Sequence, residues 1–489
     1  MQKGKSKSNG INGVSLQNSF PSSITRKPVT LSGLVNEFNN NNTGDGLHIV
    51  SLGVITLNNV QSNGNGLFGL YADNASAGSL GGITLNGTSG FSNNFSAGLE
   101  ILSKGAIKLN NISANLNGGA GAILNNTSSG NASPQSVTIN GLNNFNDNGD
   151  SGLAVNTYGA ITTNNLTANG NSGGYGLVLD NCDHNGTTCN TITSRNVIMN
   201  GTNTFNGNYL GGLFVVSRGS IKTNNLTASL NGDNGATLDN QNNFGFSSFG
   251  VTLTGTNLFE NNGVNGLTIL SHGAVTISSL TANLNFAHGA SIDTNNRVGP
   301  AAKVNLIGNN AFNGNGDGTT GGGQDGTGLV VFSDSVITIN NLTANENTEN
   351  GTDLKAYSSG NDNTSGPNMY WTPLPAAVIK LTGFNIFSGN GKDGLNFASP
   401  GNVDISKITA DNNGGGSILG GDGVEGYSEK GNITISCGSM TNNTGYGWRL
   451  QLFTASKLIT LKGVFALANT AGNTLLTDPF TVVTVRTCP

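Results

Sequence analysis

The sequence repeats one pattern of residues eight times, and this repetition limits the folds that the chain can adopt. Each repeat reads approximately V-T-L-N-G-x-N-x-F-x-x-N-x-x-x-G-L-x-V-x-S-x-G-A-I-T-x-N-N-L-T-A-x-x-N-G-x-x-G-A-x-L-x-N. A chain of this kind stacks one structural unit on its own copies, so most of it is expected to form a solenoid with loops of variable length. The repeats follow at intervals of 53 to 75 residues and start at Val29, Ile83, Val137, Val197, Val251, Val304, Ile379 and Ile433.

Each repeat consists of two similar halves. The half that starts at Val137 is matched by a second half that starts at Ile161, 24 residues later. Short apolar bursts with a period of two predict strands, and the Gly, Asn and Ser residues between them predict turns. Equivalent strands recur in the same direction along the chain, so we expect each strand to pair in parallel with its counterpart in the next coil.

We therefore predict an all-β fold, a single-stranded right-handed parallel β-helix of about 16 coils in 8 double-coil repeats. The right hand follows from the preferred handedness of parallel crossover connections. The β-helix is expected over residues 29–474, after a polar leader or N-terminal cap at 1–28 and before a C-terminal cap strand at 475–489.

Two further features of the repeat predict its interior. The first half carries F-x-x-N, and the second half carries Ala or Ser where the first has Phe, so large and small residues should alternate inside the solenoid. The Asn of F-x-x-N and the Asn-Asn and Asn-Gly pairs are expected at corners. There they should adopt the left-handed conformation and form ladders of side-chain hydrogen bonds between coils.

Composition excludes several classes of function. Charged residues make up only 10% of the chain, the formal net charge is −5, and no basic stripe is present, so a nucleic-acid partner is not expected. No run of 18 apolar residues occurs, which predicts that no helix crosses a membrane. The first residues lack an apolar signal segment, so either an export signal lies outside this chain or the chain is not exported; the cysteines favour the first.

The four cysteines indicate an oxidising compartment. Cys182 and Cys189 bracket a short loop and are predicted to form a disulfide. A zinc site that includes His184 and a pair of free thiols are the alternatives for this loop. Cys437 and Cys488 can also pair, but the sequence does not determine their distance. We expect an extracellular or cell-surface location.

The F-x-x-N copies, together with Gly118-Gly119-Ala120-Gly121-Ala122-Ile123-Leu124, carry a family resemblance. The chain resembles the passenger repeats of polymorphic outer membrane proteins, within the broad class of pectin-lyase-like β-helices. Seven F-x-x-N copies in register cover residues 29 to about 443. The resemblance implies a surface-displayed, adhesin-like protein.

Chemistry is harder to find in this sequence. Enzymes on pectin-lyase-like β-helices need clustered carboxylates, a calcium site or a basic Arg on one outward face. The outward positions of the first strand of each half are mostly Thr, with no acid before Asp404, and His272 occupies a Ser-x-Gly turn. We therefore assign no catalytic, cofactor-binding or metal-binding residue and expect no cofactor.

The variable loops are the better place to expect binding, because insertions carry function in repeat proteins. The variable loops are 181–196, 240–250 and 356–377. Tyr357, Tyr370 and Trp371 in the last loop are the predicted contacts with a glycan or protein partner. The alternative is that these rings fold back and cover the solenoid.

We favour a non-enzymatic cell-surface or secreted β-helix, adhesin-like or a scaffold, that displays variable loops for binding glycans or proteins. The alternative is a polysaccharide lyase or hydrolase of the pectin-lyase-like class, or a degenerate relative of one. Carboxylates brought together on an outward face across adjacent coils, or Asp brought to Arg or Lys there, would distinguish the enzyme. Minor alternatives are a filament subunit that self-associates end to end and an ice-binding solenoid that uses the Thr residues.

Overall fold

The computed structural model divides into two compact units, a first unit of residues 1–245 and a second unit of residues 246–489. Each unit is described by itself. The described residues are 5–7, 10–19, 26–76, 78–79, 81–129, 133–182, 194–241, 249–295, 301–316, 326–356, 377–415, 420–477, 481–485 and 488.

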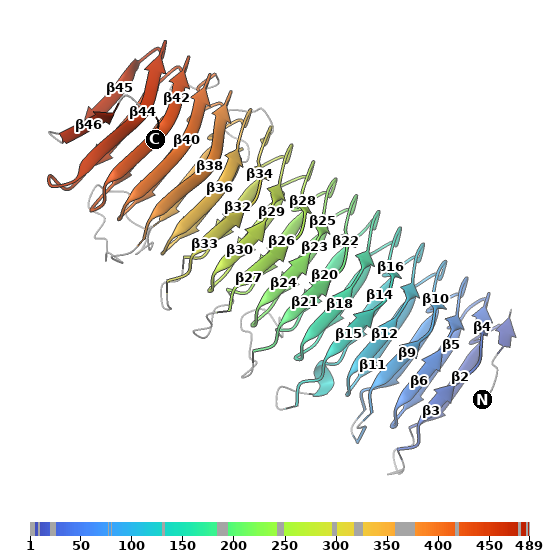
Figure 1. Ribbon diagram of the computed structural model, residues 1–489. Helices are drawn as coiled ribbons and strands as arrows, with labels where there is room; N and C mark the ends of the chain where they lie inside the picture. The colour runs from blue at the N-terminus through green and yellow to red at the C-terminus, as the bar shows by residue number, and fades with distance from the viewer. Residues whose placement is uncertain are drawn as a thin grey trace, which may run out of the picture. The chain divides into compact units, whose positions relative to one another are not determined.

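In the first unit, parallel strands build two sheets, sheet A and sheet B (Figure 1). Sheet A contains β1 (Lys5–Lys7), β3 (Val29–Leu31), β4 (Asn36–Asn39), β6 (Ile55–Asn58), β7 (Val60–Gln61), β9 (Ile83–Asn86), β10 (Ser89–Gly90), β12 (Ile107–Asn110), β13 (Ile112–Ser113), β15 (Val137–Asn140), β16 (Asn143–Asn144), β18 (Ile161–Asn164), β19 (Leu166–Thr167), β21 (Val197–Asn200), β22 (Asn203–Thr204), β24 (Ile221–Asn224) and β25 (Leu226–Thr227). Sheet B contains β2 (Val14–Asn18), β5 (Leu47–Ser51), β8 (Leu70–Asn74), β11 (Leu99–Ser103), β14 (Ala122–Asn125), β17 (Leu153–Asn156), β20 (Leu177–Asp180), β23 (Leu213–Val216) and β26 (Ala236–Asp239).

The second unit has the same two kinds of sheet. Its sheet A strands are β27 (Val251–Thr254), β28 (Asn257–Leu258), β30 (Val275–Ser278), β31 (Leu280–Thr281), β33 (Val304–Ile307), β34 (Asn310–Ala311), β36 (Ile337–Thr343), β38 (Ile379–Ser388), β40 (Val403–Asp411), β42 (Ile433–Thr441), β44 (Leu458–Leu467) and β46 (Thr481–Val485). Its sheet B strands are β29 (Leu267–Leu270), β32 (Ala290–Asp293), β35 (Leu329–Ser333), β37 (Thr352–Ala356), β39 (Leu395–Ser399), β41 (Val424–Ser428), β43 (Tyr446–Leu452) and β45 (Gly472–Thr477).

Each strand pairs with the equivalent strand of the next coil. In the second unit, for example, Val251 lies opposite Val275 and Thr252 lies opposite Thr276. Buried and less buried side chains alternate along these strands, as the period-two pattern predicts. Apart from the 3-10 turn η1 (Thr127–Ser129), the described residues contain no helix. The fold is all-β, a right-handed parallel β-helix, and this prediction is confirmed.

Strand pairing also occurs in the segments that we assigned to the two caps. In the first unit, β1 pairs with β4 and β2 pairs with β5, so residues 14–18 follow the register of residues 47–51. In the second unit, β45 pairs with β43, and β46 pairs with β44. None of the described residues forms a helix long and apolar enough to span a membrane.

Large and small side chains alternate inside each unit, as predicted. In the first unit the Phe and the small residues are almost completely buried, and in chain order they are Phe38, Ser62, Phe91, Ala114, Phe145, Ala168, Phe205 and Ala228. The second unit continues the pattern with Phe259, Ala282, Phe312, Ala344, Phe387 and Ala410. Large layers next to small ones allow the interior side chains to interdigitate.

The buried asparagines form a ladder in each unit. Each side-chain amide donates from Nδ2 to the Oδ1 of the next Asn, at 2.8–3.0 Å in the first unit, as between Asn41 and Asn65. In the second unit the distances are 2.8–3.1 Å. The residue before the ladder Asn has the left-handed conformation, for example Asn40 with φ 59° and Asn93 with φ 58°. The expectation that the Asn of F-x-x-N itself is left-handed is therefore wrong, because the preceding residue makes the turn and leaves the ladder side chain pointing inward.

Candidate carboxylate and arginine site

The three residues predicted to contact a ligand, Tyr357, Tyr370 and Trp371, lie outside the described residues. His184 and Cys189 also lie outside them. Cys182 is 1% exposed and takes part in a disulfide. Cys437 and Cys488, whose pairing the sequence did not determine, are joined by a disulfide, with their Cα atoms 5.1 Å apart.

A different group of residues forms a compact site on the second unit. Asp393 and Asp422 each stand two residues before a strand of sheet B, β39 and β41 respectively, and a glycine separates each Asp from its strand. That glycine is required where the coils approach closely, since a Cβ on Gly423 would lie 2.6 Å from the carbonyl oxygen of Gly447. The Asp side chains are fixed at this narrow corner, 5% and 0% exposed respectively.

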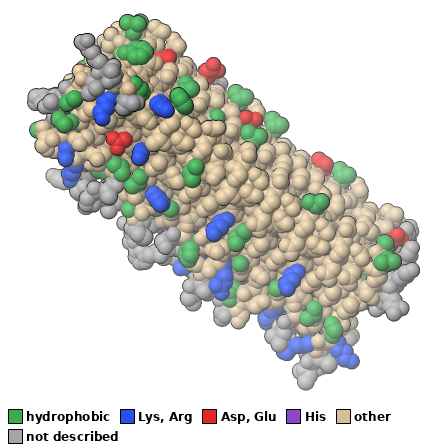
Figure 2. Space-filling model, in the orientation of Figure 1, with side chains coloured by type: hydrophobic (Ala, Val, Ile, Leu, Met, Phe, Trp, Pro, Cys, Tyr) green, Lys and Arg blue, Asp and Glu red, His purple; other side chains and the backbone are tan. Residues whose placement is uncertain are grey.

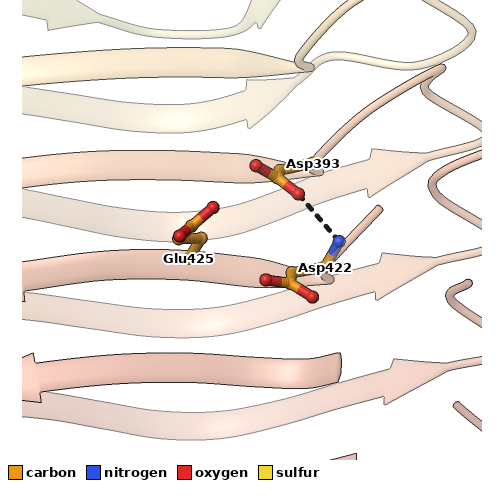
Figure 3. Close-up of side chains that lie close together, drawn as sticks. All are labelled: Asp393, Asp422 and Glu425. Atoms are coloured by element: carbon orange, nitrogen blue, oxygen red, sulfur yellow. Dashed lines mark hydrogen bonds between the residues drawn. The ribbon is translucent and has the colours of Figure 1, made fainter. Parts of the chain in front are cut away.

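Parallel register brings two further charged residues to these aspartates. Glu425 on β41 lies directly opposite Arg449 on β43. The Arg449 Nη1 donates to Oε1 of Glu425 at 2.7 Å, and its Nε lies 3.0 Å from Oδ2 of Asp422. Oxygens of the three carboxylates lie within 4.8 Å of one another, and the side chains approach each other in Figure 3. We call Asp393, Asp422, Glu425 and Arg449 the carboxylate–arginine site.

Backbone donors hold the two aspartates in place. The N–H groups of Gly421 and Asp422 donate to Oδ1 of Asp393 at 2.9 and 2.8 Å, and the second of these bonds is the dashed line in Figure 3. The N–H of Tyr446 donates to Oδ1 of Asp422 at 2.5 Å. These bonds connect three consecutive coils, so the positions of the carboxylates follow from the coil stacking.

The electrostatics of the site favour a proton on Glu425. Burial, followed by the nearby charge of Asp393, raises the pKa of Glu425 to about 7, although Arg449 acts in the opposite direction. Burial also raises the pKa of Asp422, against the lowering effect of the Tyr446 N–H. A carboxyl group that is half protonated near neutral pH can donate or accept a proton there. Three carboxylates also suit a hard cation, but the guanidinium of Arg449 already contacts two of them.

Aromatic rings flank the charged residues on the same outward face. The guanidinium carbon of Arg449 lies 6.0 Å from the ring centroid of Tyr446. The ring of Tyr427, two residues beyond Glu425 on β41, is nearly perpendicular to that of Phe453, with the ring centroids 5.4 Å apart, and Phe453 is 58% exposed. Charged side chains are sparse on the face drawn in Figure 2, so this gathering of charges and rings departs from the neutral polar character of the chain.

A second polar and aromatic group lies on sheet B of the first unit. His48 Nδ1 lies 2.7 Å from Oδ2 of Asp45, and the imidazole stacks on Tyr71 with ring centroids 4.9 Å apart. Tyr71 lies between His48 and Glu100 in the register. Burial, with the charge of Asp73 next, raises the pKa of Tyr71, and burial also raises the pKa of Glu100. His48 is already in contact with Asp45 and Tyr71, and these contacts explain the group as part of the packing between coils.

Sequence reasoning missed all four residues of the carboxylate–arginine site. It looked for acids on the outward positions of the first strand of each half, which belongs to sheet A, whereas the site lies on sheet B. The sequence did contain a signal for the two aspartates of the site. The position before the glycine of G-L-x-V is Asp at residues 45, 393 and 422, whereas other repeats have uncharged residues there, such as Ala97 and Ala120.

The fold and the site together define a right-handed parallel β-helix with a carboxylate–arginine site on one sheet. Comparisons with protein-family profiles, with curated proteins and with solved structures found no match to this chain.

Proposed function

We propose that the protein is an adhesin-like β-helix that binds polysaccharide across the outward faces of β39, β41 and β43. The observation that carries the proposal is the meeting of Glu425, Arg449 and Asp422 beside the rings of Tyr427 and Phe453. Carboxylates and guanidinium groups hydrogen-bond sugar hydroxyls, and aromatic rings stack on the apolar faces of sugars. The neutral polar surface around the site suits a neutral or weakly charged glycan.

Location and additional contacts belong to the same proposal. Disulfides persist in oxidising compartments, so the bond between Cys437 and Cys488 supports a place outside the cell or at its surface. We also propose that the loop at 356–377 contacts the glycan or a protein partner through Tyr357, Tyr370 and Trp371. The resemblance to pectin-lyase-like adhesin passengers agrees with this function.

Binding should weaken when the aromatic surface is removed. We expect Tyr427→Ala and Phe453→Ala each to reduce affinity for the recognised polysaccharide about fivefold, because each removes one stacking surface. A panel of polysaccharides immobilised on a biosensor would identify the ligand and measure both variants. Thr276→Ala, an outward substitution on β30 of sheet A, is the matched control and should bind as the wild type does. Equal binding by all three variants would place the ligand elsewhere.

Hydrolysis of the bound glycan is a second candidate function. The site meets the criterion set out from the sequence in part, since Glu425 and Arg449 on the outward face meet two buried aspartates in adjacent coils. Glu425, with its pKa raised to about 7, would protonate the glycosidic oxygen, and Asp393, the less buried aspartate, would act as the second carboxylate.

The two candidates give different results in one experiment. The polysaccharides bound in the biosensor panel would be incubated with the wild type and with Glu425→Gln, and new reducing ends would be measured. Release by the wild type that disappears in Glu425→Gln, with binding retained, supports hydrolysis. Binding without release supports the adhesin-like function alone, and the lack of any bound polysaccharide contradicts both.

A further inference from the structure

The disulfide of the second unit joins the middle of one strand of sheet A to the residues that follow another. Cys437 is in the middle of β42, and Cys488 follows β46, the sheet A strand that pairs with β44. Cys488 is exposed, whereas Cys437 is half-buried. Among the described residues, β46 pairs with one strand, β44. The disulfide therefore attaches the segment of β46 and Cys488 to the coils at a second point, on β42.

Both cysteines line a cavity of about 460 Å³ on the outer side of sheet A. The phenyl rings of Phe384 and Phe465, which are 65% and 60% exposed, lie on its wall. Lys407 is the cation of the lining, and its Nζ lies 4.8 Å from the ring centroid of Phe384. A small molecule can therefore reach the disulfide from solvent.

The fold does not need a cysteine at position 437. Cys437 has the left-handed conformation with φ 59°, and the equivalent corner of other coils is occupied by residues such as Asn341 and Ser279, with φ 46° and 48°. Asparagine adopts this conformation more readily than cysteine does. The cysteine is therefore explained by the bond that it makes and not by the turn.

We propose that the Cys437–Cys488 disulfide is a site of thiol–disulfide exchange that latches and releases β46. A thiolate from a low-molecular-weight thiol attacks Sγ of Cys488, the exposed sulfur, and forms a mixed disulfide with it. The bond between the two cysteines breaks, and its electron pair leaves with Sγ of Cys437 as a thiolate, which the positive charge of Lys407 in the same cavity favours. A second thiolate then converts the mixed disulfide into the free Cys488 thiolate and an external disulfide.

The intact protein would be incubated with reduced glutathione, quenched with an alkylating agent and mapped by peptide mass spectrometry. We expect glutathione on Cys488 and alkylation of Cys437. The absence of a mixed disulfide on Cys488, or glutathione on Cys437 instead, would overturn the proposed exchange.

Release of β46 needs a separate measurement. In the double variant Cys437→Asn, Cys488→Ser, hydrogen exchange of the amides of residues 481–485 should become at least about tenfold faster, while exchange in β42 stays unchanged. Circular dichroism would verify that the variant is folded, and the glutathione-treated wild type should show the same local change. Unchanged exchange at residues 481–485 in both samples would show that the disulfide does not latch β46.

Discussion

Asn315→Leu is expected to destabilise the second unit by about 3–5 kcal/mol, although leucine and asparagine have similar sizes. The Asn315 amide donates to Oδ1 of Asn347 at 2.9 Å and to the carbonyl oxygen of Ala282 at 3.1 Å. Its Oδ1 accepts from the backbone N–H of Asn285 at 3.0 Å and from the Asn285 side chain at 3.1 Å. Leucine leaves these buried groups without their partner, and each costs about 1–3 kcal/mol when unsatisfied.

The effect of Asn315→Leu would be measured as a shift of the urea midpoint and as faster amide hydrogen exchange in β31, β34 and β36. Exchange is the better readout because a stacked repeat need not unfold in one step. Asn309→Leu is the matched control, since Asn309 is exposed and accepts one side-chain bond, from Asn341. Losses of equal size in the two variants would contradict a stabilising role for the buried ladder.

Stability of the second unit is expected to fall as the pH rises from about 5 to 8, by about 1–2 kcal/mol, because of Glu425. The pKa of Glu425 is about 7 in the folded protein and lies near 4.5 in the unfolded chain. Folding therefore favours the protonated carboxyl group. This contribution is complete below pH 4.5 and is lost as the pH rises through 7. Its size is discounted because the side chain is 31% exposed and is paired with Arg449.

Glu425→Gln should remove most of this pH dependence, since the amide keeps the shape of the protonated acid and does not ionise. Urea midpoints of the wild type and the variant would be compared at intervals between pH 4 and pH 9. The difference between the two curves isolates Glu425 from other titrating groups. Asp404→Asn, which removes an exposed carboxylate on β40, should leave the slope of the wild type unchanged. Parallel curves for the wild type and Glu425→Gln would contradict the prediction.

The fold was predictable from the sequence because the repeats give the same information many times. One Phe or one Asn is ambiguous, but Phe38, Phe91 and Phe145 at the same place in successive repeats determine the strand register and the inward face. The left-handed residue of the F-x-x-N turn was misplaced by one position, since Asn is compatible with both the turn and the ladder, whereas the Asn-Asn pairs do contain left-handed residues such as Asn59 and Asn111. A local sequence preference does not separate these two roles.

The carboxylate–arginine site was not predictable in the same way because it depends on contacts between coils. Glu425 and Arg449 are 24 residues apart, and Asp393 and Asp422 are 29 residues apart. They meet only through the register of sheet B. An Asp before Gly also reads as an ordinary turn. Burial at the narrow corner, which makes Asp422 unlike an exposed turn residue, becomes visible only when the coils are stacked.

The alternation of Phe and Ala has a consequence for how such a chain can change length over evolutionary time. The Asn ladder repeats the same bond from coil to coil in the first unit, so gain or loss of a single coil there would leave its hydrogen bonds intact. The interior is less permissive, because deleting one coil would bring Phe145 next to Phe205, or Ala114 next to Ala168. A change in length by a pair of coils, one whole repeat, would preserve both the ladder and the alternation of large and small side chains.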